Sequence, residues 1–140
     1  MFWYKLATRL RLAGVVLLCS VILLFIMALG YSPFPFEHDK EFYLYSPSSQ
    51  AQITTTPTVY DLLYVKGERA KSLSESVDEL LIRYGAKIVF TEEFDGGTSY
   101  YCYSSKLQTP IVIDGKFVNL HIVDRASERT VGTPIIFGGY

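Results

Sequence analysis

The residues that could do chemistry in this chain begin with a cysteine, a histidine and an aspartate. Cys102, His121 and Asp124 supply the residue types of a thiol nucleophile, its general base and the group that orients the base. Their spacing matches no specific catalytic pattern. Cys102 lies between Tyr101 and Tyr103 in a pattern typical of a strand, so we expect it to point into the core as a small apolar residue. We therefore expect a thiol hydrolase only as a remote alternative, and no enzyme activity.

Acidic residues near the middle of the chain offer oxygen ligands for a hard cation. Glu92, Glu93 and Asp95 are close in sequence, and His121 could join them. The three acidic residues lack the alternating ligands of a calcium loop. We therefore expect a solvated strand end beside a turn, with no metal and no other cofactor.

One strand carries polar and aromatic residues at alternating positions. Within residues 116–123, Phe117, Asn119 and His121 share one face, and apolar residues fill the other. A patch made of an aromatic ring, an amide and an imidazole could dock a partner. These three residues are the predicted binding site, and ordinary exposed sheet is the alternative.

An uncharged apolar run dominates the first part of the chain. It extends from Leu12 to Gly30, nineteen residues without a charge. As an α-helix of about 1.5 Å per residue it would nearly match a hydrocarbon core of about 30 Å. The sequence therefore predicts a transmembrane helix over residues 12–30, with the lipid bilayer as its partner.

The charges around this run predict its orientation. Lys5, Arg9 and Arg11 precede it without any acidic residue, whereas the chain after Gly30 has ten basic and fourteen acidic residues. Basic flanks stay in the cytoplasm, so we expect residues 1–11 inside and the remainder outside the cell membrane. A net-acidic domain is a poor partner for nucleic acid, which binds clustered Lys and Arg.

A cleaved secretory signal is the alternative to a retained anchor. Ala28 and Gly30 are small residues two apart, which would allow cleavage before Tyr31. The run is longer than the usual signal core of about 7–15 residues, which favours the anchor. Cys19 follows large apolar residues, so lipoprotein processing is not expected. Cys19 lies in the apolar run and Cys102 in the domain, on different sides of the membrane boundary, so we expect no disulfide between them.

After the run, residues 31–41 form a spacer rich in proline and phenylalanine, and residues 42–140 form one small domain. We expect the phenylalanines of the spacer to lie near the lipid headgroups. A helix is predicted over residues 72–84, opened by a capping box of Ser72 with Glu75 and closed by Gly85. The predicted strands cover residues 42–46, 51–56, 59–65, 87–94, 98–104, 111–113, 116–123 and 131–137. Turns are predicted at residues 66–68, 95–97 and 114–115, and a polar loop at residues 124–129. Pro134 indicates an edge position or a bulge in the last strand.

The two halves of the domain resemble each other in sequence. Shifting the chain by 58 residues places residues 42–65 over residues 100–123 without a gap, with seven of 24 positions identical. Either the domain contains a pseudo-repeat, or two tyrosine-rich strands resemble each other by chance. The fold class predicted is α+β, a mostly antiparallel sheet with one main packed helix.

Four short motifs at the end of the chain also resemble a known family. They are Tyr103-Ser104, Asp114-Gly115-Lys116, the stretch Val118 to Ile122, and the stretch Val131 to Ile136. In this order they are similar to the end of the bacterial YwmB family, over about 40 residues. The resemblance implies a secreted protein with a TATA-binding-protein-like fold of repeated sheet-and-helix units. It implies no catalytic residues and no DNA binding, since a fold does not fix a function.

These features together predict a membrane-anchored, extracytoplasmic, non-enzymatic module that binds a protein partner in the cell envelope. A secreted ligand-binding protein, released by cleavage, is the alternative.

Overall fold

The computed structural model of the chain describes residues 1–29, 32, 34, 39–107 and 110–137. It divides into two compact units, Met1–Ser32 and Pro33–Tyr140. The second unit begins before residue 42, where the domain was predicted to begin. The earlier start has a physical reason, because the side chain of Phe34 is buried in the core of the second unit.

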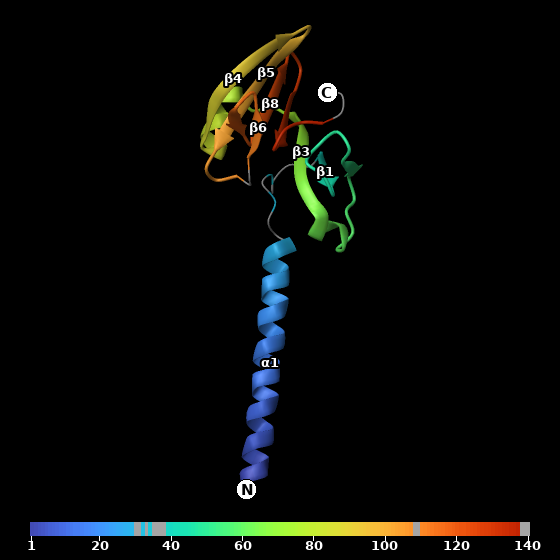
Figure 1. Ribbon diagram of the computed structural model, residues 1–140, viewed down its shortest axis with the longest axis vertical. Coiled ribbons are helices and arrows are strands. Elements are labelled where there is room, and N and C mark those ends of the chain that lie inside the picture. Colours follow the sequence, from blue (N-terminus) through green and yellow to red (C-terminus); the bar gives the residue numbers. More distant parts are fainter. Residues whose placement is uncertain (30–31, 33, 35–38, 108–109, 138–140) are drawn as a thin grey trace. The chain divides into compact units, whose positions relative to one another are not determined.

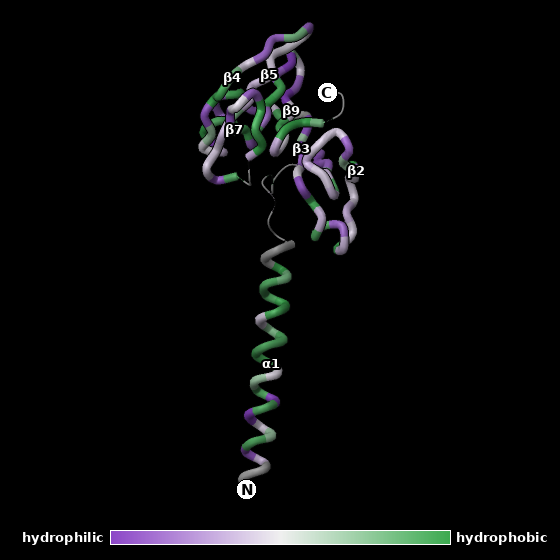
Figure 2. The backbone as a smooth tube through the Cα atoms, in the orientation of Figure 1, coloured by the Kyte–Doolittle hydropathy of each residue, from purple (hydrophilic) through white to green (hydrophobic). Residues whose placement is uncertain are grey.

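The first unit is one long helix, α1 (Phe2–Leu29). The helix begins ten residues before the predicted span, so the basic segment is helical as well. Its segment Tyr4–Ile26 is long and apolar enough to cross a membrane, and no residue of that segment is buried. Figure 2 shows apolar residues along most of this helix, with hydrophilic positions toward its N-terminal end. At about 1.5 Å per residue the segment is about 35 Å long, which suffices for a bilayer core of about 30 Å.

The second unit is an α+β domain, as predicted. Within the described residues it contains one α-helix, α2 (Val77–Tyr84), and one 3₁₀ helix, η1 (Asp61–Tyr64). Nine strands complete it (Figure 1): β1 (Lys40–Leu44), β2 (Gln52–Thr54), β3 (Val65–Leu73), β4 (Ala86–Phe94), β5 (Gly97–Ser104), β6 (Ile111–Ile113), β7 (Lys116–Val118), β8 (Leu120–Arg125) and β9 (Arg129–Thr133).

Seven strands form one antiparallel sheet in the order β2-β1-β3-β9-β8-β5-β4. Strands β6 and β7 form a separate hairpin. One face of the large sheet packs against α2, where the buried side chains of Leu80 and Tyr84 meet Cys102, Leu120 and apolar neighbours from β3 and β9. Phe34 joins this core with its ring edge toward Tyr84, at 5.4 Å between centroids. The expectation that this phenylalanine lies near lipid headgroups is therefore wrong, and Phe36 lies outside the described residues.

The helix of the domain begins one turn later than predicted. Its capping box is Ser76 with Glu79: the Ser76 hydroxyl accepts the N–H of Glu79 at 3.2 Å, and the Glu79 carboxylate accepts the N–H of Ser76 at 2.8 Å. The same Ser-x-x-Glu spacing occurs at Ser72, but there the chain is still in β3, whose end pairs with β9. Gly85 closes the helix in the left-handed conformation, as predicted.

The region between residues 59 and 68 differs most from the prediction. Residues 59–64 do not form a strand, because Asp61 accepts hydrogen bonds from the backbone and hydroxyl of Thr58 and a 3₁₀ turn follows. Val65, the last residue of the predicted strand, begins β3. Residues 66–68 do not form a turn and lie within β3. A side chain at Gly67 would clash with the carbonyl oxygen of Thr133, which explains glycine at this position.

Both predicted hairpin turns are confirmed. Strands β4 and β5 connect through Asp95 and Gly96, and β6 and β7 connect through Asp114 and Gly115. The predicted strand over residues 116–123 is interrupted at Asn119, and the predicted loop at 124–129 is shorter because both of its ends pair in the sheet. Pro134 follows β9, which lies inside the sheet rather than at an edge.

The pseudo-repeat is not shown by the structure. Residues 42–65 contain β1, β2 and η1, whereas residues 100–123 contain part of β5, the β6–β7 hairpin and the start of β8. Leu62 therefore lies in a 3₁₀ helix, whereas its sequence counterpart Leu120 lies in a central strand.

Candidate functional site

The structure does not bring Cys102, His121 and Asp124 together. In the pairing of β5 with β8, Cys102 is opposite Leu120 and Tyr101 is opposite His121. Successive side chains of a strand point to opposite faces, so Cys102 faces the helix and His121 faces away from it. Asp124 forms an ion pair with Arg129, at 2.9 Å between Oδ1 and Nε.

Both groups of the supposed nucleophile and base are held in their neutral forms. Burial raises the pKa of the Cys102 thiol to about 12, and burial lowers the pKa of the His121 imidazole to about 4. A thiol nucleophile needs the thiolate, which a low-dielectric environment disfavours. The geometry and the protonation states both argue against catalysis by Cys102.

The acidic residues near the β4–β5 turn make no recognisable metal site. Among the residues that the structure describes, no group of three potential ligands lies close enough to hold a metal ion. Glu92 instead accepts a hydrogen bond from the Tyr101 hydroxyl, at 3.0 Å on the outside of the sheet.

The three residues of the predicted binding surface have very different environments. The side chain of Phe117 is exposed, whereas Asn119 and His121 are buried, with 1% and 2% of their surface accessible. The prediction that they share one exposed face is wrong, because the strand breaks at Asn119 and the two following residues enter the large sheet. Binding of a partner by Asn119 and His121 stays a prediction.

Asn119 connects the interrupted strand to β5. Its Oδ1 accepts the backbone N–H of Ser104 at 2.8 Å, and its Nδ2 donates to the carbonyl of Ser104 at 2.7 Å. The backbone of Asn119 donates to Cys102, and its carbonyl accepts the Thr133 hydroxyl. Both polar atoms of this side chain are thus used inside the protein.

His121 lies at the inner end of a row of rings. It stacks on Tyr101 at 4.4 Å between centroids, and Tyr101 stacks on Phe90 at 4.3 Å. At the other end of the row the ammonium of Lys116 lies 5.2 Å from the centroid of Phe90. The Nδ1 atom of His121 accepts the backbone N–H of Ile136 at 3.2 Å, so the imidazole holds the segment after β9.

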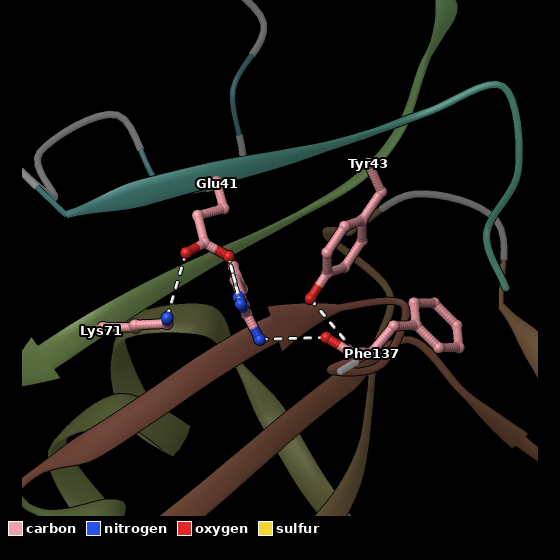
Figure 3. A network of polar contacts seen from close by, with 5 residues as sticks. Glu41, Tyr43, Lys71 and Phe137 are labelled. Atoms are coloured by element: carbon pink, nitrogen blue, oxygen red, sulfur yellow. Dashed lines mark hydrogen bonds and ion pairs between the residues drawn. The ribbon is translucent and has the colours of Figure 1, made fainter. Parts of the chain in front are cut away.

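The segment after β9 is bound at a second point by a polar network (Figure 3). Phe137 donates its N–H to the Tyr43 hydroxyl at 3.1 Å, and its carbonyl accepts from Arg69 at 3.0 Å. Arg69 also pairs with Glu41, which in turn pairs with Lys71 at 3.0 Å. Sequence reasoning missed this network, since its members are separated by up to 94 residues.

The charge of Glu41 is stabilised within this network. Burial alone would raise the pKa of Glu41, but hydrogen bonds and charges from Arg69 and Lys71 outweigh it and lower the pKa below its usual value. A mostly buried guanidinium therefore has an ionised carboxylate beside it throughout the physiological range.

The most exposed part of the predicted binding strand is the β6–β7 hairpin. Val112 and Phe117 lie directly opposite each other in its ladder, and each has 61% of its surface accessible. Val118 points the other way and is fully buried. We call the pair of Val112 and Phe117 the hairpin surface. Phe117 is the residue of the predicted site that a partner could reach.

A separate cavity lies where β3 begins, β6 begins and β9 ends. Its volume is about 290 Å³, and proline and other apolar residues form most of its wall. Lys66 is the cationic residue in this wall. The size and lining are compatible with a small ligand.

No family model matches this chain, and searches of curated proteins and of solved structures give no match either. The resemblance of residues 103–136 to the YwmB family therefore stays a prediction that these comparisons leave untested.

Proposed function

We propose that this protein is a membrane-anchored, non-enzymatic module whose domain binds a partner outside the cytoplasm. The observation that supports this function most is the apolar segment Tyr4–Ile26, none of which is buried. An unburied apolar helix of this length requires a lipid or protein environment, because in water it would expose a large hydrophobic surface. The folded second unit is then held at a membrane surface.

The proposed orientation has the N-terminus in the cytoplasm. Lys5, Arg9 and Arg11 precede the apolar run, and no acidic residue accompanies them. This excess of positive charge favours retention of the N-terminal end on the cytoplasmic side. The neutral thiol of Cys102 and its separation from His121 argue against a thiol-dependent function.

An impermeant maleimide tests the orientation in cells. A cysteine introduced by Ser127→Cys lies on an exposed loop, and Cys19→Ser removes the cysteine of α1. We expect labelling of intact spheroplasts, and no labelling of the matched Ser127→Ala protein. Labelling that requires permeabilised cells would contradict the proposed location. Extraction of the protein by alkaline carbonate would contradict the anchor.

The hairpin surface is the proposed contact with an apolar surface of another envelope protein. A photoreactive phenylalanine analogue at position 117 should form a discrete adduct in intact membranes. The same analogue at Ile82, an exposed position of α2, is the matched control. Val112→Ser should remove the adduct, since the two side chains are opposite each other. Equal adducts at both positions would exclude a specific contact at the hairpin surface.

A secreted ligand-binding protein is the second candidate, and the cavity beside Lys66 favours it. It requires cleavage of the N-terminal segment. Sequencing of the mature protein distinguishes the two functions, because cleavage would place Tyr31 at the N-terminus and retention would leave α1 attached.

A further inference from the structure

Three tyrosines form a cluster at the surface of the second unit. The ring of Tyr64 lies 5.1 Å from that of Tyr45 and 5.0 Å from that of Tyr60, measured between centroids. The hydroxyl groups of Tyr60 and Tyr64 share a hydrogen bond of 2.9 Å. Tyr45 and Tyr60 are nevertheless 54% and 61% exposed, so the rings support one another while remaining open to the surroundings.

Exposed apolar side chains extend this cluster. Val59 and Leu63 are 56% and 57% exposed, and the 3₁₀ helix η1 has no buried residue. The N–H of Leu63 donates to the carbonyl of Tyr60, so Leu63 follows Tyr60 by one turn of that helix. We call Tyr45, Val59, Tyr60, Leu63 and Tyr64 the tyrosine cluster.

The tyrosine cluster belongs to a stretch with almost no charge. Between residues 45 and 65 the sequence has a single charged residue, Asp61. Its carboxylate accepts the N–H and the hydroxyl of Thr58, each at 2.8 Å. The chain after Gly30 otherwise has more acidic than basic residues. This stretch can therefore enter a lipid headgroup layer with little loss of charge hydration.

Tyrosine suits the boundary between lipid and water because its ring is apolar and its hydroxyl is polar. From these observations, and resting on the proposed membrane anchor, we propose that the tyrosine cluster inserts into the headgroup layer of the bilayer that α1 spans. The partner is the neutral interfacial region of the lipid, without a requirement for anionic headgroups. Insertion would hold the domain against the membrane and restrict which of its surfaces a partner can reach.

The chain between the two units is short. Leu29 ends α1, and Phe34 is already part of the core of the domain. Five residues span at most about 18 Å when fully extended. A domain of this length is roughly 35 Å across, so the tether is short compared with the domain. Tethering of this kind raises the effective concentration of a weak contact, so a few exposed rings suffice.

Quenching by brominated phosphatidylcholine tests the proposal with the full-length chain in vesicles. A Trp3→Phe background removes the native tryptophan, and Tyr60→Trp places a fluorophore in the tyrosine cluster. Phe117→Trp is the matched control, because Phe117 is equally exposed and lies on the hairpin surface. Leu18→Trp reports on the middle of α1.

We expect lipid brominated on the acyl carbons nearest the headgroup to remove about half of the Tyr60→Trp emission, as for an interfacial ring. The Phe117→Trp emission should be unchanged. Raising the salt concentration should not reduce the quenching, since few charges are involved. Equal quenching of both variants, or none in Tyr60→Trp, would overturn the inference.

The outcome for α1 separates the inference from the proposed function. Quenching of Leu18→Trp by lipid brominated near the chain ends, without quenching of Tyr60→Trp, removes only the tyrosine contact. Absence of quenching in Leu18→Trp removes the anchor, and the inference with it. A blue-shifted but unquenched Tyr60→Trp emission would show that protein rather than lipid covers the cluster, which also overturns lipid insertion.

Discussion

The side-chain amide of Asn119 makes with the backbone of Ser104 the same pair of hydrogen bonds that one strand residue makes with another. The distances are 2.8 Å and 2.7 Å, and both residues are buried. The Ser104 hydroxyl in turn donates to the carbonyl of Tyr84, at the end of α2. The side chain of Asn119 therefore takes the place of a neighbouring strand in pairing with Ser104, where the sheet meets the helix.

Asn119→Ala should destabilise the domain by about 2–4 kcal/mol, because it leaves the N–H and the carbonyl of Ser104 buried without these partners. Urea unfolding of the full-length protein in detergent micelles, followed by circular dichroism, measures the loss. Ser105→Ala is the matched control, since Ser105 is the exposed neighbour and its substitution should change the free energy of unfolding little. Equal stability of the two variants would contradict a structural role for Asn119.

The burial of His121 should make the domain less stable in mild acid. Burial lowers its pKa to about 4 from an ordinary value of 6.5, so the unfolded chain binds the proton more readily. The contribution of neutral His121 to the free energy of unfolding is complete above pH 6.5. It decreases as the pH falls toward 4, by up to about 3 kcal/mol. His121→Gln should be less stable at neutral pH but should show a flatter pH dependence in this window. His38→Gln, which changes the other histidine, should leave the slope attributed to His121 intact.

Elements with a strong local signal were predictable from the sequence. Asp114 and Gly115 both have a positive φ, as a two-residue hairpin turn of this kind requires, and Gly85 ends α2 in the same way. The apolar run of α1 needs only composition to be recognised. In each case a few neighbouring residues determine the conformation, so one sequence is sufficient.

The remaining features depend on contacts between distant residues. The sequence predicts a capping box at Ser72, because nothing local distinguishes Ser72 from Ser76. Only the pairing of β3 with β9 shows that Ser76 opens the helix. His121 is buried because the strand breaks at Asn119. The regular alternation of residue types over residues 116–123 gives no indication of this break. The pairing of Glu41 with Arg69 joins β1 to β3, and no sequence spacing reveals it.

Cys102 should be unreactive in the folded protein. Burial raises the pKa of its thiol to about 12 from 9.0, so almost no thiolate exists at pH 8. In a Cys19→Ser background we expect no maleimide labelling under native conditions and complete labelling in urea, measured by mass spectrometry. Because of the same pKa shift of Cys102, the free energy of unfolding should decrease as the pH rises above 9, since the thiol ionises at a lower pH in the unfolded chain. Rapid native labelling would revive the thiol-enzyme alternative.

Glu41 pairs with the nearly buried Arg69 and with Lys71. Replacing Glu41 should therefore lower the free energy of unfolding more than replacing Lys71. Arg69 has 8% of its side chain exposed, whereas Lys71 has 36%. Glu41→Gln removes the Glu41 charge from the nearly buried guanidinium of Arg69 and should destabilise the domain by about 3 kcal/mol. Lys71→Met, the matched control, removes a partly solvated pair and should cost less than about 1 kcal/mol.

A double-mutant cycle separates the charge effect from packing. If the ion pair is the cause, the loss in Glu41→Gln with Arg69→Met should be smaller than the sum of the two single losses, because both substitutions remove the same ion pair. Some loss should remain, since Arg69 also donates to the carbonyl of Phe137. Acid unfolding provides an independent measure. The pKa of Glu41 is below its usual 4.5, so its contribution is lost only as the pH falls below that value, whereas the contribution of His121 already begins to fall below pH 6.5. Additive losses in the cycle would show that Glu41 and Arg69 act independently.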